Sequence, residues 1–280
     1  MTREKMTRSE QREAARAKAK SLREQHKKDE KRKSLLIKAG VGVGLVAVIG
    51  GIALAVASGA DKPLVEPTNM SFDDGIKMGT NLEAFTADYT PKPGSAGAGA
   101  PNIKIYLDYQ CPYCKQFELP NQSQIEKWVS TGVATVEIHP ISFLDGRGSP
   151  NEYSSRAANA AVCVAEYAPN NFYAFNSLLF SIQPEEGTPG PNNDEIFAQV
   201  KASGANATEE IKSCIDEKRF TPWIKEATDR ALYEPLPGSG LEMSGTPFIL
   251  INDQVFKTEN PAEFYSPARF AQFLQTVANN

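Results

Sequence analysis

The sequence predicts an α/β protein in which one β-sheet is interrupted by a helical insertion and preceded by a single membrane-spanning helix. Two observations predict this architecture. From residue 103 onward the patterns favour the order β-α-β, then about 80 mostly helical residues, then β-β-α. Upstream, residues 39–60 form a run of 22 residues without a charge, and about 20 apolar residues suffice for an α-helix to cross a bilayer core of ~30 Å.

The charges on the two sides of this run differ in sign. Residues 1–34 carry 13 Lys and Arg against 6 Asp and Glu, whereas residues 61–280 carry 16 against 28. The net charge of −4 is therefore the sum of +7, −12 and +1 from Lys38. Because a basic flank stays on the cytoplasmic side, we predict a single-pass protein of the cell membrane. It has a cytoplasmic tail over 1–34, an anchor over 35–60 and an extracytoplasmic remainder.

Other interpretations of the N-terminal region stay open. Ala55-Val56-Ala57 fits the cleavage pattern of a signal peptide, but the long basic stretch and the long apolar run favour a retained anchor. A buried soluble helix is disfavoured because every face is apolar and glycine is frequent. The basic tail could bind nucleic acid, yet its interleaved acidic residues and lack of aromatic residues favour attraction to the anionic inner leaflet.

The remainder divides into four segments. Residues 61–100 are interpreted as a stalk and a connector rich in Pro, Gly and Ala, within which Phe72 to Tyr89 could add an edge strand or a short helix. A first part of the α/β domain is expected at 101–148, a helical insertion at 149–235 and a second part at 236–280.

Each element follows from a pattern. Alternating apolar residues predict a strand at 103–107, and β-branched residues predict another at 133–141. Asn252-Asp253 is expected as the turn of a hairpin with strands at 248–251 and 254–257. Apolar residues at helical spacing predict helices at 115–130, 154–167, 172–182, 194–202, 208–218, 223–232 and 267–277.

Cys111-Pro112-Tyr113-Cys114 lies directly after the first strand and opens the first helix. A zinc or iron-sulfur site needs further ligands at compatible spacing, but Cys163 and Cys214 are isolated and His139 is the one exported histidine, so no metal is expected. A structural disulfide that closes two intervening residues is a poor clamp. The position between strand and helix favours a redox-active dithiol instead.

The helix start predicts different roles for the two thiols. The helix dipole and free N–H groups stabilise a thiolate at Cys111, whereas Cys114, one turn later, is expected to face inward and to resolve a mixed disulfide. Pro112 offers no N–H and Tyr113 no imidazolium, so the motif does not fix the potential. Asp108 is either a proton-transfer group for Cys114 or a cap at the strand end.

Four segments resemble a known family. Thr246-Pro247 lies in the last of them, although taken alone it fits an ordinary turn before a strand. The segments are Asp108 to Cys114 with Phe117, Ser155 to Cys163, Phe172 to Phe180, and Gly245 to Asn252. In this order over about 175 residues, they resemble the DsbA-like thiol-disulfide oxidoreductases, in their membrane-anchored bacterial form. The resemblance implies a thioredoxin-like fold interrupted by an inserted α-helical domain.

The resemblance also implies residue roles. Cys111 is the expected nucleophile, Cys114 its resolving partner, and Thr246-Pro247 a cis-Pro loop that binds substrate. Tyr113 stands where a His is usual in the family, and Cys-Pro-Tyr-Cys also occurs in reducing glutaredoxins, so the direction of the reaction stays open.

The leading functional hypothesis is an exported, membrane-tethered oxidase that donates the Cys111–Cys114 disulfide to unfolded polypeptides with free thiols. The resemblance suggests reoxidation by a membrane quinone-linked partner, either DsbB-like or similar to vitamin K epoxide reductase. No flavin or nicotinamide site is expected, nor a nucleic-acid partner, and a monomer is the default. Two alternatives remain: an exported reductase or isomerase, for example in cytochrome c maturation, and a non-catalytic, chaperone-like peptide-binding module.

Two further residue sets have a structural and a chemical interpretation. Cys163 and Cys214 form an even pair in an exported domain, which favours a structural disulfide over a second redox relay. His139 precedes Pro140 in a strand, which favours a structural histidine over a general base.

Overall fold

The computed structural model describes residues 64–90, 99–206 and 208–279. Within these residues one mixed sheet has the strand order β1-β3-β2-β4-β5. Strands β2 and β3 are parallel, whereas β1 is antiparallel to β3, and β4 is antiparallel to both β2 and β5. The strands are β1 (Ile76–Met78), β2 (Asn102–Leu107), β3 (Thr135–Pro140), β4 (Phe248–Ile251) and β5 (Gln254–Val255).

The sheet is buried on both faces because its central strands carry apolar side chains on both sides. On one face, Ile105 and Leu107 share a hydrophobic cluster with Phe117 of α2 (Pro112–Ser130) and Phe270 of α8 (Pro267–Ala278). On the other face, Tyr106 belongs to a smaller cluster with Phe248, Leu250 and Leu236. Full burial of one such side chain contributes about 1.5–3 kcal/mol, so both faces hold β2 in place up to the residue before Asp108.

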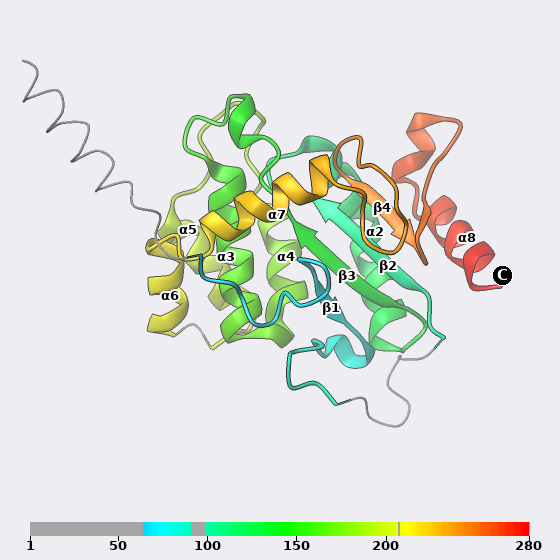
Figure 1. Cartoon of the computed structure of the whole chain (residues 1–280), viewed down its shortest axis with the longest axis horizontal. Coiled ribbons are helices and arrows are strands. Elements are labelled where there is room, and N and C mark those ends of the chain that lie inside the picture. The colour runs from blue at the N-terminus through cyan, green and yellow to red at the C-terminus, as the bar shows by residue number, and fades with distance from the viewer. Residues whose placement is uncertain (1–63, 91–98, 207, 280) are drawn as a thin grey trace, which may run out of the picture. The chain divides into compact units, whose positions relative to one another are not determined.

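Helices fill the interval between β3 and β4. In Figure 1 the helices α3 to α6 form a layer beside the sheet, and α7 runs back from them toward the strands. A capping box between Asn192 and Glu195 starts α5, and Thr208 caps α6. The helices are α3 (Tyr153–Tyr167), α4 (Phe172–Ser181), α5 (Asn193–Ala202), α6 (Glu209–Asp216) and α7 (Thr221–Tyr233).

Residues 64–90 are part of the folded unit rather than a stalk. The expectation of a stalk needs correction for residues 64–90, because Ile76 and Met78 of β1 are fully buried at the edge of the sheet; the expected connector at 91–98 lies outside the described residues. The Thr68 backbone N–H and hydroxyl both donate to the Glu166 carboxylate of α3, at 2.7 and 2.8 Å. The edge strand or short helix expected between Phe72 and Tyr89 forms as the edge strand β1, followed by a short 3-10 helix at Thr80–Leu82.

The predicted tail (1–34) and anchor (35–60) lie outside the described residues. In the part of the chain that the structure describes, no helix combines the length and the apolar character needed to cross a bilayer.

Candidate active site

Cys111 lies at the N-terminus of α2, where the chain leaves the sheet. It is the N-cap residue, with extended backbone angles, and Pro112 is the first helical residue. Proline fits that position because its fixed φ suits a helix and its missing N–H has no intrahelical partner there. The Lys115 N–H donates to the Cys111 carbonyl oxygen at 3.3 Å and closes the first turn. The Cys111 sulfur therefore faces the positive end of the helix dipole.

The surroundings of Cys111 favour its thiolate. A hydrogen bond from the Cys114 thiol is the largest influence, and the backbone N–H groups of Tyr113 and Cys114 add to it. Burial of the Cys111 side chain acts in the opposite direction, and the balance lowers the pKa of the Cys111 thiol to about 6. A thiol with this pKa is mostly ionised at neutral pH, which makes it both a ready nucleophile and a good leaving group.

Cys114 has the opposite character. Its side chain is fully buried, and burial, followed by its hydrogen bond to Cys111, raises its pKa well above the ordinary value of a thiol. The Asp108 backbone N–H lies 3.5 Å from its sulfur. Both cysteines are present as free thiols. The structure thus holds an ionisable outer sulfur and a protonated inner one.

The loop before β4 faces the outer sulfur. The Thr246–Pro247 peptide bond is cis, and the Cys111 thiol donates to the Thr246 carbonyl oxygen at 3.3 Å. Strand β4 starts at the next residue, Phe248, and pairs in antiparallel register with Tyr106 of β2. The pairing of β2 with β4 thus carries Thr246 to the end of β2, beside Cys111, although 135 positions separate the two residues.

Asp108 holds three segments together beneath the dithiol. Its carboxylate is fully buried and accepts hydrogen bonds from the Gln110 N–H and the Ser154 hydroxyl at 2.8 and 2.7 Å, and from the Leu144 N–H at 2.9 Å. Burial raises the pKa of Asp108 to about 7, against these three hydrogen bonds, which lower it. The carboxyl is therefore half-protonated near neutral pH. It can hold or release a proton close to Cys114, whose sulfur lies 3.5 Å from the Asp108 backbone nitrogen.

Two residues near the dithiol were not singled out from the sequence. Gln183, just beyond α4, donates from Nε2 to the Cys111 carbonyl oxygen at 2.9 Å. Glu118 lies one turn beyond Cys114 in α2, is 2% exposed, and has its pKa raised to about 8 by burial. Glu118 lies four residues after Cys114 in the same helix, so the sequence alone places both side chains on one helix face. No pattern in the sequence places Gln183 near the dithiol.

A groove runs along the cis-Pro loop. It has a volume of about 380 Å³ and is lined mainly by apolar side chains, among them Pro247, Phe248, Phe256, Phe264 and Tyr265. Tyr113, between the two cysteines, is 56% exposed. An open apolar surface thus adjoins the outer sulfur.

The remaining cysteines form a disulfide within the helical insertion. Cys163 of α3 and Cys214 of α6 are bonded, with their Cα atoms 5.9 Å apart, and both side chains are fully buried. The Asn159 side chain donates to the Cys214 carbonyl oxygen at 3.3 Å. The bond therefore links two helices of the insertion inside the core.

His139 lies on β3 and is 1% exposed. Its Nε2 lies 2.8 Å from Oε1 of Glu137, and its ring stacks on that of Tyr106. The described residues hold no group of three or more His, Cys, Asp or Glu side chains placed to bind a metal ion.

The chain matches a protein family and several solved structures. The sequence model of a family described as Thioredoxin matches residues 94–268. Oxidised DsbA of Mycobacterium tuberculosis superposes with a TM-score of 0.56 at 20% identity, over 74% of this chain and 93% of that one. For the thiol-disulfide oxidoreductase MdbA of Corynebacterium diphtheriae the TM-score is 0.55 at 20% identity, over 78% and 96%. The expected thioredoxin-like α/β fold is confirmed.

A curated relative is much longer than this chain. The serine/threonine-protein kinase PknE of Mycobacterium tuberculosis is 26% identical over 193 residues, which is 68% of this chain and 31% of that protein. The chain thus spans about a third of the length of the curated relative that it matches.

Proposed function

The chain belongs to the Thioredoxin family whose model it matches, and on that premise we propose that it is a thiol-disulfide oxidoreductase that donates the Cys111–Cys114 disulfide to exported polypeptides. The observation that carries this proposal is the contrast between the two sulfurs. Cys111 has a pKa lowered to about 6, whereas the pKa of the buried Cys114 is raised. Thioredoxin-like solved structures include enzymes named for this reaction.

The reaction proceeds by two thiol-disulfide exchanges. A client thiolate attacks the Cys111 sulfur of the oxidised protein, the Cys111–Cys114 bond breaks, and Cys114 leaves with the electron pair and takes up a proton. A second client thiolate then attacks the client sulfur of the mixed disulfide and releases Cys111 as a thiolate. The client loses two electrons and gains a disulfide, and the enzyme dithiol gains both electrons.

Local geometry supports this order of events. The stabilised thiolate makes Cys111 the better leaving group in the second exchange. Burial of Cys114 keeps a client thiol away from the inner sulfur. The Thr246 carbonyl oxygen, next to the Cys111 sulfur, is in reach of a backbone N–H of an extended client, and the groove beside Pro247 offers apolar contacts for its side chains.

The proposal includes a location and partners. The domain is tethered to the outer face of the cell membrane by residues 35–60, with the N-terminus in the cytoplasm, and acts as a monomer on unfolded polypeptides with free thiols. Reoxidation of the dithiol is assigned to a quinone-linked membrane protein, DsbB-like or similar to vitamin K epoxide reductase. The distribution of charge around residues 39–60 supports the orientation.

A trapping experiment tests the proposal. Full-length Cys114→Ala protein, incubated with a reduced unfolded polypeptide under mild oxidation, is expected to accumulate a mixed disulfide through Cys111. The matched Cys111→Ser variant should accumulate none. Equal function of wild-type protein and Cys111→Ser would instead identify a non-catalytic peptide-binding module.

The direction of the reaction needs a second measurement. Equilibration of the Cys111–Cys114 pair with glutathione buffers gives its reduction potential. A donor of disulfides should have a potential above that of the cytosolic glutathione pool, about −220 to −260 mV by extraction. A value well below this range would favour the reductase instead.

A further inference from the structure

The segment that follows α4 runs past the dithiol, and we call its residues 183–190 the strap. Its first residue, Gln183, donates from Nε2 to the Cys111 carbonyl oxygen at 2.9 Å. Its other end is held by Asn151, whose side chain exchanges two hydrogen bonds with the backbone of Gly190, at 2.9 and 3.1 Å. The strap thus belongs to the helical insertion by sequence and to the dithiol site by contact.

The residue before Cys111 is inserted into the middle of the strap. Gln110 is 1% exposed, and its Nε2 lies 3.1 Å from the Thr188 carbonyl oxygen and 3.5 Å from that of Glu185, to which it donates. The same two strap residues form a turn, because the Thr188 N–H donates to the Glu185 carbonyl oxygen at 3.1 Å. Two consecutive residues, Gln110 and Cys111, are therefore bound to the strap at separate points.

Packing fixes the position from which Gln183 reaches Cys111. Gln183 lies two residues beyond the last residue of α4. The Phe180 ring in the last turn of α4 lies 5.2 Å from the Tyr109 ring, measured between centroids, and both side chains are fully buried. The Tyr109 hydroxyl also donates to the side-chain oxygen of Asn176, at 2.9 Å. The end of α4 and the residues that precede Cys111 are therefore held in one arrangement.

The orientation of the Cys111 backbone decides what its sulfur faces. As the N-cap residue, Cys111 has extended backbone angles, and in this conformation an N-cap side chain points back at the first N–H groups of the helix. Its carbonyl oxygen accepts two hydrogen bonds, from the Lys115 N–H at 3.3 Å and from Gln183 at 2.9 Å. The intrahelical bond lies beyond the usual upper limit of about 3.2 Å. The bond from Gln183 is thus the stronger restraint on this backbone.

We infer that Gln183 is a positioning residue of the dithiol: its amide holds the Cys111 backbone in the conformation in which the sulfur faces the free N–H groups of α2. The inference deepens the proposed function and rests on it for the effect on disulfide transfer. The helical insertion thereby sets the reactivity of a cysteine that belongs to the first part of the α/β domain.

The full-length Gln183→Met variant tests the inference, because methionine keeps the length of the side chain and removes its donor. The pKa of Cys111 should rise by about 0.5–1 unit from its wild-type value of about 6, the equivalent of one ordinary hydrogen bond. The rate of carbamidomethylation of Cys111 at pH 5.5 should then fall about threefold to eightfold. At pH 7 the equilibrium with glutathione should shift about threefold to fivefold toward the disulfide form.

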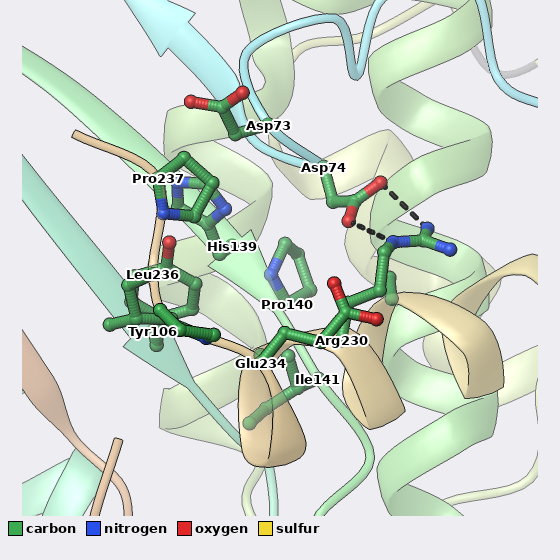
Figure 2. A pocket seen from close by; sticks show the side chains of 13 residues that line it. Asp73, Asp74, Tyr106, His139, Pro140, Ile141, Arg230, Glu234, Leu236 and Pro237 are labelled. Atoms are coloured by element: carbon green, nitrogen blue, oxygen red, sulfur yellow. Dashed lines mark hydrogen bonds and ion pairs between the residues drawn. The ribbon is translucent and has the colours of Figure 1, made fainter. Parts of the chain in front are cut away.

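Asp74→Asn is the matched control, because it weakens a tertiary contact elsewhere in the fold. The Asp74 carboxylate forms a two-point ion pair with Arg230, at 2.8 and 2.9 Å, and Figure 2 shows this pair beside a cavity that α7 and the turn before β1 help to form. The lining residues of that cavity do not include Cys111 or Cys114. The control should unfold at a lower temperature and keep the alkylation midpoint of the wild type.

A second variant, Gln183→Ala, also lacks the donor and adds no bulk, so it should raise the Cys111 midpoint by a similar amount. An unchanged midpoint in either Gln183 variant overturns the inference. An equal rise in Asp74→Asn overturns it too, because the change would then follow from a general loss of stability. Alkylation needs no client, so failure of the wild-type protein to pass on its disulfide would overturn the proposed function alone, and the midpoints would still decide the inference.

Discussion

The pKa of Cys111 depends most on its neighbour Cys114, and this dependence can be measured directly. The change is Cys114→Ala, which removes the hydrogen bond that lowers the Cys111 pKa most. A hydrogen bond to a charged group contributes about 1.5–3 kcal/mol, and one pKa unit corresponds to about 1.36 kcal/mol. The pKa should therefore rise by about 1–2 units from its wild-type value of about 6.

The assay is the rate of carbamidomethylation of Cys111 as a function of pH, followed by mass spectrometry. At pH 6.5 a rise of about 1.5 units reduces the thiolate fraction roughly eightfold. Cys114→Ser is the matched control, because its hydroxyl keeps a donor at the same place, and its profile should stay near that of the wild type. Midpoints near that of an ordinary thiol in all three proteins, or equal midpoints for the Ala and Ser variants, would refute the reasoning.

The same pKa shift links pH to the stability of the reduced protein. The folded pKa of about 6 lies below the reference value of 9.0, so the ionised thiol stabilises the folded dithiol form above pH 9, and this stabilisation is lost as pH falls through 6. It amounts to about 4 kcal/mol at most and to about 1.4 kcal/mol at pH 7. For a two-electron couple, the latter raises the reduction potential by about 30 mV, in the direction of a disulfide donor.

Three further predictions concern stability. Replacing both Cys163 and Cys214 by Ala should lower the free energy of unfolding by about 4 kcal/mol in urea, because the bond closes a 51-residue separation; an unchanged urea midpoint would contradict a structural role. Burial raises the folded pKa of Glu118 to about 8, so the wild-type protein loses stability as pH rises from 4.5 to 8, whereas Glu118→Gln does not. Over this pH interval, the free energy of unfolding of oxidised Glu118→Gln should increase by about 4 kcal/mol relative to that of the oxidised wild type. Parallel curves of unfolding free energy against pH would count against this. Asp108→Asn should lower the free energy of unfolding by about 1–3 kcal/mol at pH 8. One oxygen of Asp108 accepts from the Gln110 N–H and the Ser154 hydroxyl and the other from the Leu144 N–H, so the amide N–H₂ would face a donor in either orientation. An unchanged free energy of unfolding would show that the three hydrogen bonds contribute little.

Much of the fold follows from local patterns, and the exceptions have a physical cause. The alternation of apolar and polar residues predicts β2, and the apolar run before Asn252-Asp253 predicts β4 at Phe248–Ile251. Both strands are recognisable because they are buried along their length, and burial selects apolar residues. The edge strand β1 has three residues, too few for a pattern, and exists because it pairs with β3, which lies about 60 residues further along the chain.

The candidate site divides in the same way. The Cys111 to Cys114 motif and Thr246-Pro247 are visible as short segments, and the structure brings them together. The hydrogen bonds of Asp108 depend on Leu144 and Ser154, which are 36 and 46 positions away and follow no local rule. The Gln183 contact with Cys111 likewise arises from tertiary packing alone.

Disulfide transfer from the oxidised full-length protein to a reduced dithiol peptide tests the central claim most directly. Acid quenching followed by mass spectrometry counts the disulfides on both molecules. We predict one peptide disulfide formed per chain, a reduced Cys111–Cys114 pair, an intact Cys163–Cys214 bond and no transfer by Cys111→Ser. A peptide that stays reduced, or transfer that continues in Cys111→Ser, would contradict the claim.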